Sequence, residues 1–233
     1  MKQGADFIAT GHYAKKAIKD GIHFLLKGDD ENKDQSYFLY RLKQEQLKNI
    51  IFPLGELTKD KVRQKAREYN LEVSDKKDSQ DFYSGSYNDL LNIEEKEENI
   101  VDSNGNILGT HKGFFNYTIG QRRGIQISAN EPLYVIGLNK EKNEVIVGKL
   151  DSTFKKEVII KDENWIVEPP KDNMKVLAKI RSAMPKKEAT IKVENDKYKI
   201  VFDEYIKSPA KGQSAVIYDG EYVLGGGVID EIN

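Results

Sequence analysis

Short apolar runs separated by turn residues dominate the hydrophobic pattern of this chain. Residues 7–10 form such a run, which predicts a short buried strand that ends in the polar turn Gly11-His12. Residues 13–19 and 22–27 flank Asp20-Gly21, a dipeptide that favours a hairpin turn. Ligands of α/β sheets gather at the carboxyl ends of strands, so the turn after residue 10 is a candidate binding position. An ordinary glycine turn beside a polar histidine explains the same residues about equally well.

Helical periodicity is clearest after residue 57. Thr58 is a suitable N-cap, and Val62 and Ala66 recur on one helical face. Asn70 fits the left-handed position that ends a helix. A second helical segment is predicted near residues 44–51, and Pro53 stops it.

A polar triplet, Lys33-Asp34-Gln35, precedes three aromatic residues at positions 37, 38 and 40. Asp34 is expected to cap a helix that starts here, since its side chain accepts hydrogen bonds from first-turn N–H groups. Lys33 and Gln35 would then lie at a helix N-terminus, which favours anions such as phosphate. Taken alone, the stretch favours a capped amphipathic helix with a solvated lysine.

From residue 98 onward the pattern predicts β structure. Asn104-Gly105 favours the turn of one hairpin, and residues 140–143 join the strands of another. Beyond residue 151, short strands with regular turns suggest a small barrel or sandwich. Gly225-Gly226-Gly227 lies inside the last strand, which indicates a bulge, a barrel bend or close backbone packing.

Residues 111–124 combine cations, amides, aromatics and glycines in one short span. Basic residues interleaved with aromatics suit RNA, with cations on phosphates and rings under bases. The competing interpretation is a glycine-bent strand whose aromatics belong to the core. We expect both, with the aromatics inside and Gln121, Arg122 and Arg123 outside.

Composition narrows the function classes. The chain has 233 residues, 38% of them hydrophobic, which suffices for two or three small domains with packed cores. Neither a membrane span nor a signal peptide is recognisable, so we expect a cytoplasmic protein without a membrane partner. The net charge is −1, but residues 171–199 hold nine Lys or Arg against four Asp or Glu. A local basic face is compatible with a phosphate-backbone partner, although charge alone favours solvated, lysine-rich strands.

Cysteine is absent from the sequence. This excludes disulfides, cysteine-ligated metal centres and thiolate catalysis within this chain. The three histidines, His12, His23 and His111, show no metal-ligand spacing, so we expect no metal site.

Seven short motifs, in this order across almost the whole chain, resemble the tRNA-specific thiouridylases (the MnmA or TrmU family). They are Thr10-Gly11-His12-Tyr13, Lys33-Asp34-Gln35-Ser36-Tyr37-Phe38-Leu39, Phe52-Pro53-Leu54-Gly55, Lys77-Asp78-Ser79-Gln80, Tyr117-Thr118-Ile119-Gly120-Gln121-Arg122-Arg123-Gly124, Gly212-Gln213-Ser214-Ala215 and Leu224-Gly225-Gly226-Gly227.

The resemblance implies an α+β, multi-domain fold. Residues 1–85 would be the C-terminal part of an α/β ATP-pyrophosphatase domain of the adenine nucleotide alpha hydrolase type. Residues 86–150 would form a small central β-rich domain, and residues 151–233 a C-terminal β-barrel. Enzymes of this family adenylate the wobble uridine of certain tRNAs at its C2 oxygen and then replace that oxygen with sulfur. The implied cofactor is ATP, with Mg²⁺ as its counter-ion, and the implied partner is tRNA.

The resemblance also assigns site residues. Gly11 matches the family's ATP-contacting glycine. The positions that match the family's tRNA contacts are His12, Lys33, Asp34, Gln35, Arg181, Ser182 and Gln213. At Ser182 the chain departs from the family's usual Arg-Tyr pair.

Two departures concern catalysis. The family's Ser-Gly-Gly-x-Asp-Ser phosphate loop does not occur in this sequence, and Tyr83 stands where the family has the cysteine that carries a persulfide. A phenol cannot carry a persulfide, because that chemistry needs a thiolate. We therefore expect no catalytic residue in this chain and no activity of the chain alone. A missing N-terminal half or a partner subunit, with a sulfur-donor protein, would complete the enzyme.

Two other hypotheses remain open at this point. The chain could be a non-catalytic tRNA-binding module or pseudoenzyme, or a protein-interaction scaffold with small β domains and no RNA role.

Overall fold

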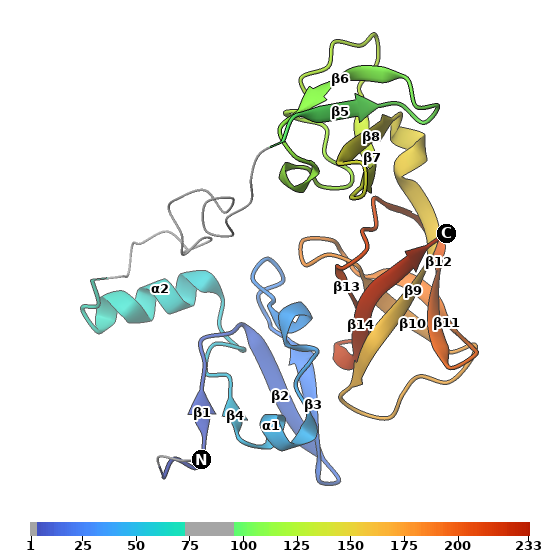
Figure 1. The fold of residues 1–233 in the computed structure, drawn as a ribbon. Helices are drawn as coiled ribbons and strands as arrows, with labels where there is room; N and C mark the ends of the chain where they lie inside the picture. Colours follow the sequence, from blue (N-terminus) through green and yellow to red (C-terminus); the bar gives the residue numbers. More distant parts are fainter. Residues whose placement is uncertain (1–3, 73–95) are drawn as a thin grey trace. The chain divides into compact units, whose positions relative to one another are not determined.

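The computed structural model describes residues 4–72 and 96–233 (Figure 1). The chain divides into two compact units. Unit 1 comprises Met1–Lys76, Lys156–Glu204 and Lys211–Asn233, and unit 2 comprises Lys77–Lys155 and Tyr205–Ala210. The motif at residues 77–80 and Tyr83 lie outside the described residues.

The N-terminal part of unit 1 begins with two short parallel strands. Strand β1 (Ile8–Ala9) pairs with β4 (Ile50–Ile51). The predicted strand therefore forms, but its predicted burial is wrong: Phe7 is 55% exposed and Ile8 54%. The reason is that, within the described residues, β4 is the partner of β1 in a two-stranded sheet that leaves these side chains in contact with solvent.

The predicted hairpin at Asp20-Gly21 is confirmed. Strands β2 (Ala14–Lys19) and β3 (Ile22–Lys27) pair antiparallel across it. Asp20 and Gly21 both have positive φ, 52° and 78°, as a tight hairpin turn requires.

Three helical elements follow the hairpin. The first, η1 (Ser36–Leu39), is a 3₁₀ turn. The second, α1 (Gln44–Lys48), ends earlier than predicted because residues 50 and 51 form strand β4. The predicted helix after Thr58 is α2 (Lys59–Glu68), and the Thr58 hydroxyl accepts a hydrogen bond from Lys61 N at 3.4 Å. Asn70 follows it with φ 51°, confirming the predicted left-handed helix end.

The C-terminal part of unit 1 is a barrel rather than a sandwich (Figure 1). Its sheet runs in the order β13-β10-β11-β12-β9-β14, and an additional pairing of β13 with β14 closes it. The strands are β9 (Phe154–Trp165), β10 (Lys175–Lys179), β11 (Lys187–Glu194), β12 (Lys197–Lys207), β13 (Ser214–Asp219) and β14 (Tyr222–Ile232).

The glycines of β14 allow this closure. A Cβ at Gly225 would overlap the carbonyl oxygen of Asn164 on β9, and one at Gly226 would overlap that of Ala215 on β13. At Gly227, a Cβ would lie 2.7 Å from Lys161 O. The structural interpretation of the three glycines, close backbone packing, is confirmed.

The hairpin β2–β3 extends the barrel sheet, which the sequence pattern did not indicate. Strand β3 pairs with the start of β14, Leu25 opposite Val223. Gln44 Nε2 reinforces this junction by donating to the carbonyl oxygens of His23 and Ile166, both at 2.7 Å. One hydrophobic core therefore joins the two parts of unit 1, and its buried members are Ala14, Leu25, Tyr37, Tyr40, Leu47, Ile166, Val216, Tyr218 and Val223.

Unit 2 is a small sheet with its own core. Its strand order is β6-β5-β8-β7, with β5 and β8 parallel and both predicted hairpins present. The elements are β5 (Glu98–Val101), β6 (Ile107–His111), η2 (Phe114–Asn116), β7 (Tyr134–Asn139), β8 (Glu144–Gly148) and η3 (Leu150–Thr153). The buried core consists of Ile100, Ile125, Val135, Val145 and Val147.

Candidate functional site

The loop that carries Lys33-Asp34-Gln35 is organised by the Asp34 carboxylate. Its oxygens accept hydrogen bonds from Gly28 N at 3.1 Å and from both N and Oγ of Ser36 at 3.0 Å. The predicted helix cap is therefore wrong: η1 is four residues long, Gln35 holds the N-cap position, and no side chain caps it. Asp34 forms an Asx turn instead and ties the loop back to Gly28 at the end of β3.

Gln35 connects this loop to the turn after β1. Its Oε1 accepts from Tyr13 N at 3.0 Å, and its own N donates to Tyr13 O at 2.9 Å. The neighbouring His12 is held by Thr10, with 2.7 Å between Thr10 Oγ1 and His12 Nδ1. The structure thus brings Gln35 beside Gly11-His12, although 22 residues separate Tyr13 from Gln35.

Tyr37 and Tyr40 connect the same loop to the barrel. The Tyr37 hydroxyl donates to Ser214 O at 2.8 Å, and the Ser214 hydroxyl donates to the Tyr40 oxygen at 3.1 Å. Ser214 follows Gln213, which is exposed. Burial raises the pKa of Tyr37 to about 12, and the Arg181 guanidinium counteracts that rise in part. Arg181 and Gln213, predicted from sequence, therefore lie around Tyr37.

A cavity of about 590 Å³ lies between this loop and the segment after β10. Two residues predicted to contact tRNA, Asp34 and Ser182, line it. Three lysines line it as well: Lys27, Lys179 and Lys186. The lining is completed by Glu31, Asn32, Ala183, Met184 and Pro185.

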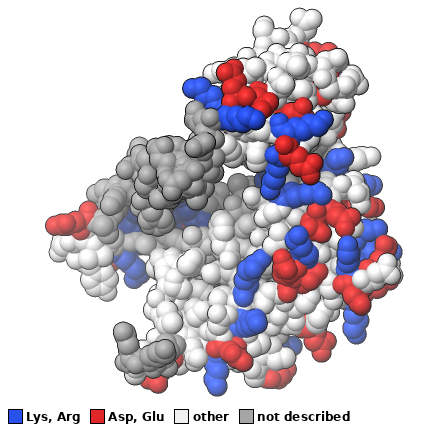
Figure 2. Space-filling model, viewed as in Figure 1, with Lys and Arg blue, Asp and Glu red and all other residues white. Residues whose placement is uncertain are grey.

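Four of the eight lysines in the stretch 171–199 form ion pairs in the fold. The partner carboxylates lie on the adjacent strand or two strands away. Figure 2 shows cationic and acidic side chains intermixed over part of one face. The pairs are Lys175–Asp203, Lys187–Glu204, Lys197–Glu231 and Lys199–Glu194, at 2.8–3.2 Å. Lys179 and Lys186 form no ion pair within the described residues, and both line the cavity beside Asp34.

Sequence reasoning missed Lys179 and Lys186. Lys179 is the last residue of β10 and only 8% exposed, and Lys186 Nζ lies 4.5 Å from the centroid of the Tyr218 ring. Burial lowers the pKa of both lysines. The sequence around a lysine on a short strand does not show whether that lysine is buried. The signal that could have drawn attention to Lys179 and Lys186 was the nearby Arg181-Ser182 pair.

Gly11 lies where the rule for α/β sheets places a ligand. It is exposed and follows β1 at the carboxyl end of the parallel pair β1–β4. A Cβ at Gly11 would meet Leu54 Cδ1 at 3.7 Å, an ordinary contact, so the packing of the described residues does not require a glycine there. This open backbone fits close approach of a ligand. In the described part of the chain, no group of three or more His, Asp or Glu residues could hold a metal ion.

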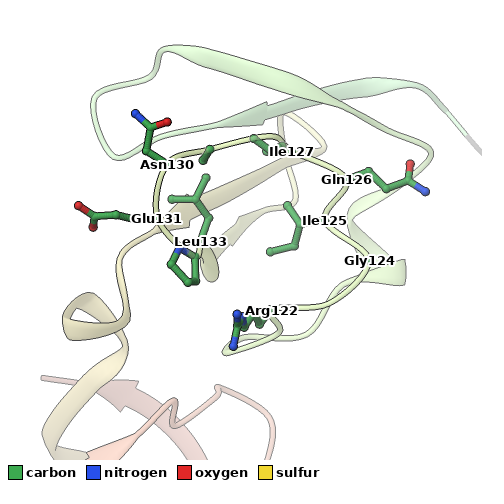
Figure 3. A pocket seen from close by; sticks show the side chains of 10 residues that line it. Arg122, Gly124, Ile125, Gln126, Ile127, Asn130, Glu131 and Leu133 are labelled. Atoms are coloured by element: carbon green, nitrogen blue, oxygen red, sulfur yellow. The ribbon is translucent and has the colours of Figure 1, made fainter.

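Unit 2 has a separate hollow of about 400 Å³, formed by the loop from Arg122 to Leu133 (Figure 3). Ile125 and Leu133 point into the space that the loop encloses, whereas Gln126 points away from it. Arg122 is one of the three residues predicted to lie outside the core in this region. It is exposed and borders the hollow.

The other two residues predicted to lie outside the core of unit 2, Gln121 and Arg123, differ in exposure. Arg123 is exposed. Gln121 is half-buried and shapes the turn, because its amide accepts from Thr118 N at 3.0 Å and donates to Arg123 O at 2.9 Å.

Three family models match consecutive parts of the chain. The tRNA methyl transferase HUP domain matches residues 1–83, the tRNA methyl transferase PRC-barrel domain residues 90–149, and the aminomethyltransferase beta-barrel domain residues 155–229. These matches fit the observed multi-domain layout with a C-terminal barrel.

Curated relatives match over nearly the whole chain. A protein of Syntrophomonas wolfei subsp. wolfei (strain DSM 2245B / Goettingen), named tRNA-specific 2-thiouridylase MnmA, is 44% identical over 97% of this chain and 69% of its own length. The chain belongs to the tRNA-specific 2-thiouridylase family. Proteins with the same name from Clostridium botulinum (strain Alaska E43 / Type E3) and Clostridioides difficile (strain 630) are 44% and 43% identical over 98% of this chain.

The chain spans about two thirds of the length of these 2-thiouridylases, 66% for the two clostridial proteins. In the described ranges, no helix has the length and apolar character needed to cross a membrane.

Proposed function

We propose that this chain is the tRNA-holding portion of a tRNA-specific 2-thiouridylase, acting on the wobble uridine in the cytoplasm. The observation that carries the proposal is the gathering of four sequence-distant segments in unit 1. Gln35 is bonded to Tyr13 beside His12, and Tyr37 is bonded to Ser214 beside Gln213. The Arg181-Ser182 segment lies next to the same loop.

Each proposed tRNA contact has a role that its chemistry suits. Lys33 and Arg181 would bind phosphates, because cations dominate contacts to the nucleic-acid backbone. His12, Ser182 and Gln213 would hydrogen-bond to sugar or base edges. Asp34 and Gln35 would act mainly by holding the loop in place, because their oxygens are occupied by backbone N–H groups.

Nucleotide binding is proposed at the turn after β1. Gly11 would allow the backbone to approach ATP, with Mg²⁺ as the counter-ion, and ATP would supply the adenylyl group that activates the uridine C2 oxygen. The family's phosphate-loop motif and a cysteine for sulfur transfer do not occur in this sequence. We therefore propose that a missing N-terminal half or partner subunit completes the adenylation site and that a sulfur-donor protein takes part.

Binding of an unmodified tRNA by the purified chain at two salt concentrations tests the proposal. We expect binding that weakens steeply with salt, since each phosphate contact releases counter-ions. We also expect no tRNA-dependent pyrophosphate release by the chain alone. Robust ATP turnover would show that the chain does not need a separate phosphate loop, and no binding even at low salt would favour the scaffold hypothesis.

A non-catalytic tRNA-binding module or pseudoenzyme is the second candidate, favoured by the absence of cysteine. Complementation separates the two candidates. If thiolation returns when an N-terminal half of a relative is supplied together with this chain, the pseudoenzyme interpretation is wrong. If tRNA binds normally but thiolation never returns, that interpretation is supported.

A further inference from the structure

The cavity beside Asp34 contains a buried lysine without a polar partner. Lys179 is 8% exposed, and its side chain makes no hydrogen bond or ion pair with residues 4–72 and 96–233. Its Nζ lies 5.9 Å from the centroid of the Tyr37 ring, too far for more than a weak cation–π contact. A buried ammonium normally has a counter-charge, because removing it from water is costly.

The acidic groups of the cavity are engaged elsewhere. Glu31 is bonded to Lys27 at 2.8 Å. The Asp34 oxygens accept from Gly28 N, Ser36 N and Ser36 Oγ, and Asp34 acts on Lys179 only through space. The carboxylates that line the cavity therefore leave the Lys179 ammonium without a direct counter-charge.

A second cation stands beside it. Lys186 donates to Gly220 O at 2.7 Å, so part of its hydrogen-bonding capacity is used. Burial is the main cause that lowers its pKa, and the charges of Lys27 and Lys179 lower it further, whereas Asp34 and Glu221 raise it. Mutual repulsion among these lysines would be relieved by one anion placed between them.

We propose that Lys179, assisted by Lys186, binds a phosphate group of the tRNA backbone in this cavity. The inference rests on the proposed tRNA-binding function and adds two residues that the family resemblance did not assign. The cavity of about 590 Å³ has ample room for a phosphodiester, and the Ser182 side chain at its wall offers a further hydrogen-bond donor. Lys33 and Arg181 lie on the two segments that border the cavity. They would bind neighbouring phosphates of the same RNA strand.

Salt-dependent binding of an unmodified tRNA transcript to Lys179→Met tests this proposal. The variant removes the charge and keeps an unbranched apolar chain. We expect about tenfold weaker binding at 0.1 M salt, and a slope of log K against log salt that is smaller by about one. The matched control is Lys171→Met, which removes an exposed lysine in the same part of the chain, and we expect a change of no more than about twofold.

A stability measurement separates a binding role from a structural one. Because Lys179 is buried without a partner, Lys179→Met should keep or raise the urea midpoint. Lys179→Arg retains the charge and should restore most of the salt slope, a rescue that a merely structural role would not produce. A lowered midpoint together with no rescue by Lys179→Arg would overturn the proposal.

The outcomes distinguish this inference from the proposed function. If the wild-type chain binds tRNA and Lys179→Met behaves like Lys171→Met, the phosphate site is wrong while tRNA binding stands. If the wild-type chain binds no tRNA, both fail. A parallel titration with ATP identifies the source of the phosphate: loss of ATP binding with unchanged tRNA binding would overturn the assignment to RNA.

Discussion

The hydroxyl of Tyr37 donates a hydrogen bond to the backbone carbonyl of Ser214, 2.8 Å away and 177 residues later in the chain. Tyr37 lies in the loop after the first hairpin, and Ser214 begins strand β13 of the barrel. The bond joins the loop that carries Lys33 to the turn that carries Gln213. Two segments predicted to contact the same tRNA are therefore held at a fixed distance by one buried side chain.

Replacing Tyr37 with phenylalanine should destabilise unit 1. The change removes the hydrogen bond and leaves Ser214 O without this donor, so we expect a loss of about 1 kcal/mol in the free energy of unfolding. Urea unfolding measures it. Tyr69→Phe is the matched control, because Tyr69 is 74% exposed and should change stability by less than about 0.5 kcal/mol. Equal effects of the two variants would contradict the role assigned to Tyr37.

Stability should fall in alkaline solution partly because of the same tyrosine. Burial raises the pKa of Tyr37 from 10.0 to about 12. Between these pH values the unfolded chain loses the phenolic proton while the native chain keeps it, so the free energy of unfolding decreases as pH rises. The stability difference between wild type and Tyr37→Phe should therefore shrink from pH 10 to 12, which urea unfolding at several pH values can measure. A difference that stays constant would show that residue 37 does not titrate in this way.

Two glycines of the N-terminal part should differ in how much stability they lose when replaced by alanine. A Cβ at Gly55 would overlap the carbonyl oxygen of Ala14, so Gly55→Ala should cost about 3 kcal/mol of stability or more. At Gly11 a Cβ meets only an ordinary contact with Leu54, so Gly11→Ala should change stability by less than about 0.5 kcal/mol. Thermal unfolding compares them.

The functional effect of Gly11→Ala follows from its proposed contact with ATP. With an N-terminal half of a relative supplied, the variant should release less tRNA-dependent pyrophosphate than wild type, because the added methyl group obstructs the approach of the nucleotide. Normal release by a stably folded Gly11→Ala chain would remove Gly11 from the proposed nucleotide site.

Lys33→Ala should weaken tRNA binding without unfolding the chain. Lys33 is half-buried in the loop that Asp34 organises, and loss of one phosphate contact should reduce the salt slope of binding by about one. Fluorescence anisotropy with labelled tRNA measures the slope, and circular dichroism checks the fold. The control is Lys175→Ala, which removes a barrel lysine paired with Asp203. If Lys33→Ala unfolds unit 1, the lysine has a structural role instead.

Local features of this chain could be predicted from the sequence because they depend on residues a few positions apart. Asp20-Gly21 and Asn104-Gly105 set their hairpin turns through their own backbone preferences. Thr58 and Asn70 mark the two ends of α2 for the same reason. The order of the motifs identified the family, which the relatives establish. The roles of the individual site residues stay predictions, because they depend on a partner.

Tertiary structure alone decided which side chains are buried, paired or gathered together. The apolar run at Phe7 and Ile8 is exposed, since burial depends on which distant segment covers a strand. Asp34 bonds to Gly28 across a loop rather than capping a helix. Four of the eight lysines of 171–199 pair with carboxylates on other strands, and Lys179 is left buried beside Tyr37. Charge pairing and burial act through space between residues far apart in sequence, so a linear pattern cannot specify them.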